Sequence, residues 1–444
     1  MDTVRDKTIR FLREVIAWVP ALGILMVVVS LPFHYNWLQR WGLYFAGIGY
    51  LVDYAVNCRW HGWQWTRDKW VYVVFIAFYA CIPVRQLFDP LETWSYLYKL
   101  REYLPFALIG IMGLGGMKSK LKLDYVTWAM LGSCVYMAVV LAVAMWKDPA
   151  KPFVNWLGSL NYWRCELINS HMTVNFYCNI ALIFGTWTIL HSDCKRWAKV
   201  LTGIGMAGCV AGLLLSEGRA GQLTMLVLMT VAPCVYLYKH HRKWLLPVLG
   251  VLLLFGGAVW YFNPQYHNDS AKDNPRLYIW RVAYETAKEK PVFGWGVSSA
   301  RQQFIARGRA DKDFCVHYIE GYESISKTRF GEVDYQVMHP HNVFLETMME
   351  FGLVGLALLL LCIGLPIGLL PSKSKRLYLA ACMFVFVMQA MFETFGRDLN
   401  TMWLPLMTLL WHFVAGGTSS DCATKATVPV AQECSLPSDA QTAR

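Results

Sequence analysis

Apolar segments long enough to cross a lipid bilayer recur along this 444-residue chain, and they constrain its fold more than any other feature. These segments begin near Val15, Trp41, Trp70, Leu104, Tyr125, Met172, Trp197, Gly221, Trp244, Val343, Leu377 and Leu399. The composition agrees, since 56% of the residues are hydrophobic, 16% are charged and the mean hydropathy is +0.34. We therefore predict an all-α polytopic membrane protein with about twelve transmembrane helices.

The apolar segments divide the chain into four regions. We predict transmembrane helices 1–9 in residues 1–262, a large loop domain in 263–342, helices 10–12 in 343–415 and a disordered cytoplasmic tail in 416–444. The tail is assigned as disordered because it is rich in Ser, Thr, Ala and Pro.

The loop of residues 263–342 is too long to be a passive connector between packed helices, so it is the predicted functional domain. It is expected to be partly helical. Asn274 and Pro275 form a helix start, and Pro291 ends that helix. A second helix is predicted from Ser298 to Arg307.

Lysine and arginine are unevenly shared between alternate loops, which predicts the orientation. Dense clusters such as Lys118–Lys122 and Lys239–Lys243 are assigned to the cytoplasm, so both termini are cytoplasmic and the large loop is external. Cations in the opposite loops are sparser, and several lie beside acids, as Arg101 does beside Glu102. The net charge of +11 follows from this topology and from anionic lipid, which excludes nucleic acid as the expected partner.

Thirteen cysteines are scattered along the chain, mostly within the apolar segments and without metal-type CxxC pairs. Only Cys165 and Cys315 fall in loops assigned to the external side. Whether these two form a disulfide stays open.

The segment His339-Pro340-His341-Asn342 lies at the end of the large loop and opens an apolar helix. It places imidazoles at the membrane surface, where a lipid-linked substrate would present its head group, and imidazole takes a proton near neutral pH. His341 is the candidate general base or, alternatively, an interfacial histidine that caps the helix. His339 is the second candidate base. Glu350 lies further along the same helix, roughly opposite His341, and is interpreted as a structural partner for an arginine.

Two arginines are candidates for binding an anion. Arg276 lies in the first turn of the loop helix, where free backbone N–H groups already favour a phosphate. Arg219 is the single cation of a very short external turn, where its partner is either Glu217 or an anionic substrate. Arg85 and Arg164 are also assigned to the external side and are weaker candidates.

Asp311-Lys312-Asp313 has the DxD form that many sugar transferases use to hold a divalent cation. We interpret these carboxylates as solvated side chains and expect no metal and no other cofactor, because arginines can neutralise an anionic substrate.

Taken in order, these motifs resemble the O-antigen ligase family, within a wider group that includes O-antigen polymerases and protein O-oligosaccharyltransferases. The ligases' His-Asn-x9-Gly-x2-Gly pattern is reproduced by His341-Asn342, followed by Gly352 after nine residues and by Gly355 after two more. The loop-helix signature of the group is matched by Arg276, Trp280, Pro291, Gly294 and Gly296. The turn from Ser216 to Gly221 is similar to the family's arginine turn, with Gly218 where a serine is common.

The resemblance implies a metal-independent, inverting transferase of the C-type glycosyltransferase class in the bacterial inner membrane, with a periplasmic active site. It would move a glycan from undecaprenyl diphosphate to a sugar hydroxyl of lipid A-core. In that reaction, His341 would be the general base and Arg276 and Arg219 would bind the diphosphate, with Asn342 among the weaker site candidates.

Two other functions remain open. An O-antigen polymerase or a protein O-oligosaccharyltransferase would use the same donor on the same face of the membrane. A lipid-linked glycan transporter would instead be expected to carry broken helices and charges near the bilayer midplane.

Overall fold

The computed structural model of the protein describes residues 2–33, 36–57, 63–88, 93–117, 120–147, 171–215, 219–262, 275–315, 339–392 and 400–414. These residues form helices joined by turns, with no β-strand among them, as predicted for an all-α protein. Within the predicted large loop, residues 263–274 and 316–338 lie outside the described residues, as does the predicted tail from 416 to 444.

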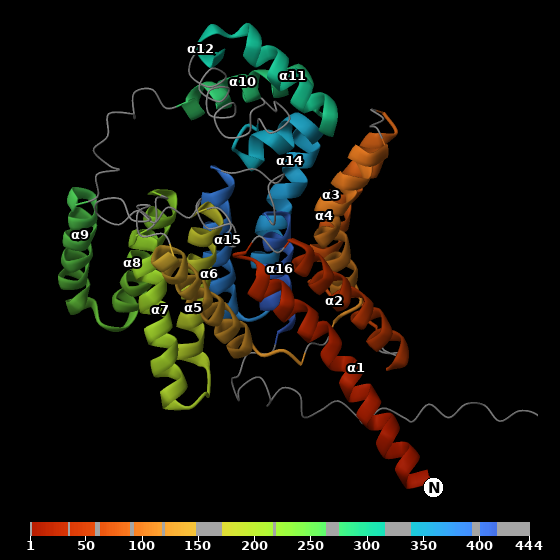
Figure 1. Ribbon diagram of the computed structural model, residues 1–444, viewed down its shortest axis with the longest axis vertical. Coiled ribbons are helices and arrows are strands. Elements are labelled where there is room, and N and C mark those ends of the chain that lie inside the picture. Colours follow the sequence, from red (N-terminus) through yellow and green to blue (C-terminus); the bar gives the residue numbers. More distant parts are fainter. Residues whose placement is uncertain are drawn as a thin grey trace, which may run out of the picture.

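The helices follow one another in chain order, with labels as in Figure 1. The first part of the chain holds α1 (Asp2–Ser30), α2 (Asn36–Val56), α3 (Lys69–Gln86), α4 (Thr93–Leu114), α5 (Leu123–Lys147), α6 (His171–His191), α7 (Arg196–Leu215), α8 (Arg219–His240), η3 (Arg242–Trp244) and α9 (Leu245–Phe262). The second part holds α10 (Pro275–Glu289), α11 (Val297–Ala310), α12 (Lys312–Phe314), α14 (Val343–Leu369), α15 (Lys373–Ala390) and α16 (Asn400–Phe413).

Each apolar segment of the sequence falls on one of the long helices α1–α9 and α14–α16, beginning within it or one residue before it. Among the described residues, five stretches are long and apolar enough to cross a membrane: Lys7–Ser30, Leu123–Val140, Met172–His191, Arg196–Leu214 and Val343–Leu369. The chain is therefore a multi-pass membrane protein. The larger number of about twelve spans, and the external placement of the loop, stay predictions.

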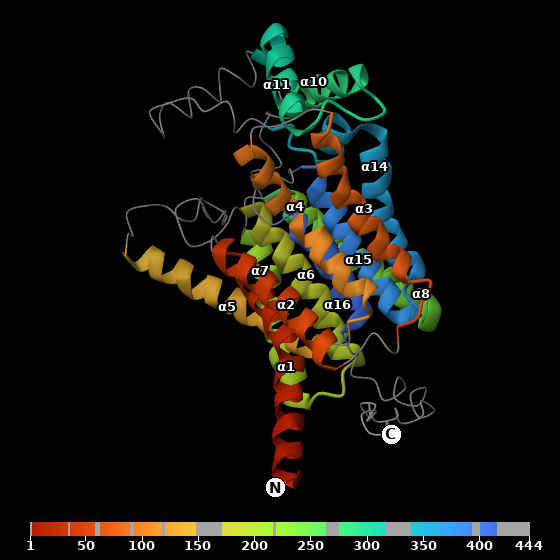
Figure 2. The same ribbon diagram turned by 90° about the vertical axis from the view of Figure 1, so that its right-hand side faces the viewer.

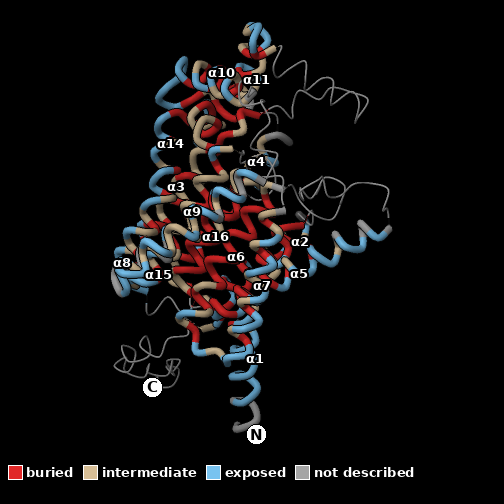
Figure 3. The backbone as a smooth tube through the Cα atoms, turned by 90° about the vertical axis from the view of Figure 1, so that its left-hand side faces the viewer, coloured by how far each residue is buried: buried red, intermediate tan, exposed pale blue. Residues whose placement is uncertain are grey.

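The long helices form a bundle, and α10, α11 and α12 lie together at the end of it opposite the N-terminal end of α1 (Figures 1 and 2). Helix α6 is central, since 83% of its apolar stretch is buried, whereas only 22% of the α7 stretch is. Figure 3 shows the buried residues gathered around α6 and α16 and the exposed ones along α8 and the far end of α1. Large apolar side chains such as Ile204 and Leu254 point outward, as expected for surfaces that face lipid.

The loop helices have a small core of their own. Ile279, Val282 and Ala283 of α10 pack with Phe304 of α11 and with Met349 of α14. The first loop helix begins at Pro275, as the sequence predicts, and ends at Glu289, before Pro291. The second runs from Val297 to Ala310, so it is slightly longer than the predicted 298–307. This packing places both helices directly over the start of α14.

Candidate functional site

The start of α14 holds His341 in an unusual backbone conformation. Asn342 is the N-cap residue, and its side-chain Oδ1 accepts hydrogen bonds from the backbone N–H groups of Phe344 and Leu345, each at 3.0 Å. His341, directly before the cap, has φ of 47°, in the left-handed region that non-glycine residues rarely adopt. Its side chain is half-buried. Such strain is concentrated at functional sites, where the surrounding structure maintains it.

A turn after α15 brings the His341 segment and Arg276 together. The Asn342 side-chain amide donates to the carbonyl of Met391 at 3.4 Å. The guanidinium carbon of Arg276 lies 5.3 Å from the ring centroid of Phe392, within the range of a cation–π contact. The Trp280 ring packs against the same ring at 6.1 Å. Met391 and Phe392 were not predicted as site residues, because no local signal in the sequence distinguishes this turn from other helix ends.

Helix α14 is broken at Gly352, and the segment from Pro291 to Gly296 fills the break. In a regular helix, the amides of Leu353 and Val354 would donate to the carbonyls of Met349 and Glu350. Instead, those amides donate to the carbonyls of Pro291 (2.7 Å) and Val292 (3.2 Å), while the two carbonyls accept from the amides of Trp295 (2.8 Å) and Gly296 (3.0 Å). The loop therefore replaces both lost helical bonds, and we call this arrangement the α14 interlock.

Glycines of two sequence motifs make the interlock possible. Gly352 and Gly294 both have positive φ, at 66° and 68°. A Cβ on Gly352 would lie 2.3 Å from the carbonyl oxygen of Val292, and one on Gly294 would lie 2.5 Å from the carbonyl carbon of Glu350. The backbone near Gly294 thus occupies the space that a side chain on Gly352 would need, and the backbone near Gly352 occupies the space that a side chain on Gly294 would need. This contact gives the motif glycines a structural role, which is to hold α10 and α11 against α14.

Arg85, one of the weaker sequence candidates, also belongs to this contact. Its Nη2 donates to the carbonyl of Gly294 at 3.1 Å, so it ties the end of α3 to the interlock. The interaction is with a backbone oxygen, which gives Arg85 a positioning role in the structure.

Beneath the start of α14 lies a group of charged side chains that we call the buried charge cluster: Lys99, Glu102, Arg301, His339, Glu346 and Glu350. The Lys99 Nζ is 3.1 Å from Glu102 Oε2, and the charge of Lys99 also attracts Glu350 and Glu346. Arg301 from α11 contacts both ring nitrogens of His339, at 2.9 and 3.1 Å. The charges of Lys99 from α4 and Arg301 from α11, two helices far apart in the chain, both act on Glu350.

His339 is fully part of this cluster. Its ring lies 3.7 Å from Glu346 Oε1, and the side chains of both residues are nearly inaccessible, at 5% and 6% exposure. Burial lowers the pKa of His339 below its usual value, although Glu346 acts in the opposite direction. His339 is thus a neutral, enclosed ring at neutral pH, whereas His341, two residues later, is half-exposed.

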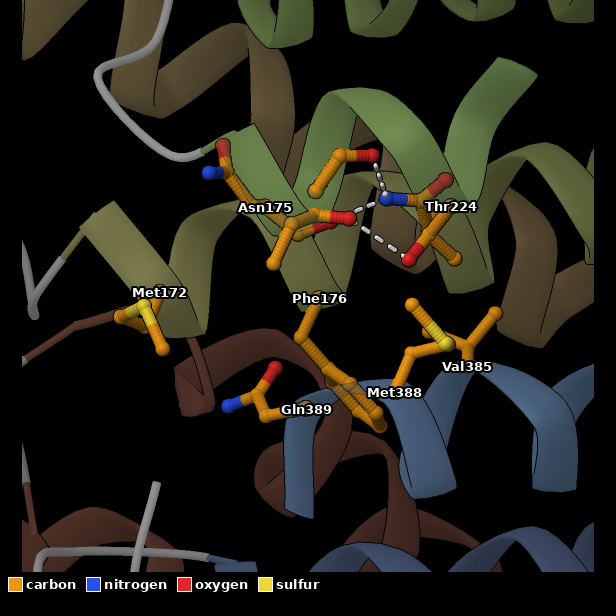
Figure 4. Close-up of a pocket in the computed structure, with 10 residues that line it drawn as sticks. Met172, Asn175, Phe176, Thr224, Val385, Met388 and Gln389 are labelled. Carbon is orange, nitrogen blue, oxygen red and sulfur yellow. Dashed lines mark hydrogen bonds between the residues drawn. The ribbon is translucent and has the colours of Figure 1, made fainter. Parts of the chain in front are cut away.

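A small pocket adjoins the Arg219 turn. It has an empty volume of about 300 Å³, and it lies between Asn175 and Thr224 on one side and Met388 and Gln389 of α15 on the other (Figure 4). The pocket connects the start of α8 with the end of α15, close to the Met391 turn.

The close fit of α8 against α6 in this pocket depends on Gly221. A Cβ there would lie 2.5 Å from the Cβ of Asn175, and the Asn179 side-chain amide donates to the Gly221 carbonyl at 3.1 Å. Arg219 is the first residue of α8, and its side chain is outside what the structure describes. Arg164 and Cys165 also lie outside the described residues.

The DxD triplet is engaged by an arginine. The Arg281 Nη2 contacts both carboxylate oxygens of Asp311, at 2.9 and 2.7 Å, and lies 3.4 Å from Asp313. Burial acts to raise the pKa of Asp311, but the Phe314 N–H and Arg281 outweigh it, so the pKa is lowered. Asp311 also caps the short helix α12. In the described structure, this triplet links α10 to α12.

A comparison with protein families identifies a match that covers this site. Residues 204–360 match the model of the family described as O-antigen ligase. The matched segment runs from within α7 into α14, so it contains Arg219, Arg276, the interlock and His341. No curated protein matches the chain.

Proposed function

The resemblance to the O-antigen ligase family is confirmed over residues 204–360, and on this premise we propose that the protein is an O-antigen ligase. It transfers a polysaccharide from undecaprenyl diphosphate to a sugar hydroxyl of lipid A-core. The family match supports a glycosyltransferase-like enzyme of the O-antigen ligase or polymerase type that acts on lipid-linked glycan in a membrane. The donor, the acceptor and the residue roles below are our proposal.

The observation that carries the proposal is that Asn342, the neighbour of His341, and Arg276 contact the same turn. Asn342 fixes the backbone at His341 and binds the Met391 carbonyl, while Arg276 lies on the neighbouring Phe392 ring. A proton acceptor and a fixed cation therefore adjoin the same end of α15. Transfer of a sugar from a diphosphate to a hydroxyl needs both of these groups.

His341 takes the proton of the incoming sugar hydroxyl as that oxygen attacks the anomeric carbon. The bond from this carbon to the diphosphate oxygen breaks on the opposite face, so the configuration is inverted. The half-exposed side chain of His341 can reach a substrate, whereas the ring of His339 is enclosed by Arg301 and Glu346. This difference in access is why we assign the base to His341.

Arg276 and Arg219 stabilise the departing diphosphate. Both lie in the first turn of a helix, where backbone N–H groups add to the positive charge. No metal is needed in this scheme, because two guanidinium groups can balance the charge that develops on the leaving group.

We place the active site in the periplasm, with both termini in the cytoplasm, on the basis of the lysine and arginine distribution. The fold supports this orientation, since the N-terminal end of α1 and the loop helices lie at opposite ends of the bundle (Figure 2). Reporter fusions after Lys122 and after Arg307 test it. Cytoplasmic placement of the second fusion would contradict the mechanism.

The reaction is tested first in cells that carry or lack the gene. Loss of the ligase leaves free lipid A-core and accumulated lipid-linked polymer. Lipopolysaccharide bearing single repeat units would identify a polymerase, and lost glycosylation of a protein would identify an oligosaccharyltransferase. Free lipid A-core with lipid-linked glycan retained in the cytoplasmic leaflet would identify a transporter, because loss of a ligase leaves that glycan in the periplasmic leaflet.

The diphosphate site is tested by donor binding to purified variants. Arg276→Ala should weaken binding, and Arg276→Lys should restore it only in part, because an ammonium group cannot form the bidentate contact of a guanidinium. Arg281→Ala is the matched control, since this arginine lies on the same helix but pairs with Asp311. Wild-type donor affinity in a folded Arg276→Ala protein would remove this residue from the site.

A further inference from the structure

Three cysteines from three different helices converge inside the bundle. Cys134 of α5, Cys178 of α6 and Cys209 of α7 have sulfur atoms within 4.8 Å of one another. The sulfur atoms of Cys134 and Cys209 are 3.6 Å apart. Cys178 and Cys209 are buried and Cys134 is partly buried. All three lie within apolar stretches that are long enough to span a membrane.

The packing of α6 against α7 brings the sulfur atoms of Cys178 and Cys209 together. These consecutive helices are antiparallel, and a Cβ on Gly185 would lie 3.5 Å from the Thr202 side chain. Cys178 lies seven residues before Gly185, and Cys209 lies seven residues after Thr202. Seven residues are about two helical turns, so both side chains advance to the same level on facing sides.

The packing of α5 against α7 brings the sulfur atom of Cys134 to the same place. A Cβ on Gly205 would lie 3.1 Å from the Leu131 side chain. Cys134 is one turn after Leu131, and Cys209 is one turn after Gly205. Two independent helix contacts therefore fix the same convergence, and the absence of a side chain at Gly205 and Gly185 permits it.

The separation of the sulfur atoms suits a metal ion bound at their centre. With metal–sulfur bonds of about 2.3 Å, three thiolates around one ion lie about 4.0 Å from one another. Among the described residues, no histidine or carboxylate joins this group. Structural zinc almost always takes four ligands, whereas Cu(I) is a soft ion that thiolates select and that accepts fewer of them.

We propose that Cys134, Cys178 and Cys209 form a three-sulfur site for Cu(I). The first thiol to lose its proton neutralises the monovalent cation, which limits the cost of burying charge among apolar helices. The other two sulfur atoms coordinate as neutral thiols, because the loss of their protons as well would leave a net charge of minus two among apolar helices. By joining α5, α6 and α7, the bound ion ties the central helix to two of its neighbours. This proposal does not depend on the transferase activity.

The test uses the full-length protein, purified in reduced form and titrated with Cu(I) without oxygen against a chromophoric Cu(I) chelator. We expect one Cu(I) per chain to resist the competitor, and X-ray absorption of the complex to show sulfur neighbours at metal–thiolate distance. Cys134→Ala, Cys178→Ala and Cys209→Ala should each weaken binding by more than about a hundredfold. Cys382→Ala is the matched control, because this cysteine is buried like Cys178 and Cys209 but lies on α15.

Wild-type protein supplies the decisive result, so the test does not depend on the variants folding. If the competitor removes all Cu(I) from the wild type, the three cysteines are small apolar core residues and the proposal is wrong. A Cys134–Cys209 disulfide in protein isolated without reductant would also overturn it. So would preferential binding of Zn(II) with four ligands, or an equal loss of Cu(I) binding in the Cys382 control.

Discussion

His339 and His341 are two residues apart in the sequence, yet they belong to regions of opposite character. His339 lies in the buried charge cluster, held between Arg301 and Glu346. His341 lies at the half-exposed mouth of α14, beside the turn that Arg276 contacts. One region encloses acids and cations close together inside the protein, and the other has a strained backbone and access from outside. In our proposal, the first region supports the site and the second performs the chemistry.

The largest expected effect separates the two histidines directly. His341→Ala should lower glycan transfer by a factor of about a hundred to ten thousand, because a general base is lost. Its thermal stability should change little. His339→Ala should show a milder loss of transfer and a larger loss of stability. Transfer rates of both purified variants, with unfolding temperatures, check this, and near-normal turnover of His341→Ala would remove it from the chemistry.

The buried charge cluster should be sensitive to the loss of one cation. Lys99→Met leaves Glu102 without its 3.1 Å partner and weakens the compensation of Glu350, so we expect a stability loss of about 3–5 kcal/mol. The matched control is Lys288→Met, which removes an exposed pair with Glu285 and should cost about 0–1 kcal/mol. Denaturation of the two purified proteins measures the difference. Equal losses would mean that the cluster contributes no more than a surface pair.

The interlock that joins the two regions should not tolerate a side chain. Gly352→Ala is expected to cost about 2–5 kcal/mol, since the new Cβ meets the Val292 carbonyl in a positive-φ conformation. Gly364→Ala on the same helix meets no atom within 4 Å and should be neutral or slightly stabilising. Hydrogen exchange of α10 and α11 should increase only in the Gly352 variant. Unchanged exchange there would show that the interlock does not hold the loop helices.

A smaller effect concerns pH. Burial lowers the pKa of His339. At a pH near the ordinary histidine pKa of about 6.5, this residue is therefore protonated in a smaller fraction of folded molecules than of unfolded ones. Stability from this residue is therefore present above that pH and is lost as the pH falls below it. His339→Gln should flatten the fall in unfolding temperature between about pH 7 and pH 5. An identical pH profile in the variant would contradict this assignment.

The smallest effect is expected at the DxD triplet. Asp311→Ala with Asp313→Ala removes exposed contacts to Arg281, so stability should fall by only about 1 kcal/mol and transfer should persist. Transfer should also survive chelation by EDTA. Loss of turnover with EDTA that Mg²⁺ restores, reproduced by the double variant, would make the enzyme metal-dependent.

The sequence by itself determined which segments form helices and where several of them begin. Apolar length, Pro275 at a helix start and Asn342 at a cap act within a few residues, so they can be interpreted without the fold. The motif that opens α14 also predicted His341 as a candidate base, although the motif alone could not explain why Gly352 belongs to it.

Only the tertiary structure decided what those residues contact. The replacement of two helical hydrogen bonds by the 291–296 segment, the enclosure of His339 by Arg301 and the convergence of three cysteines all join parts of the chain that are distant in sequence. The Met391 turn had no local signal because its role comes from Asn342 and Arg276 lying beside it. Such contacts depend on the register between packed helices, which is set by side-chain fit and by close approaches at glycines, not by local sequence pattern.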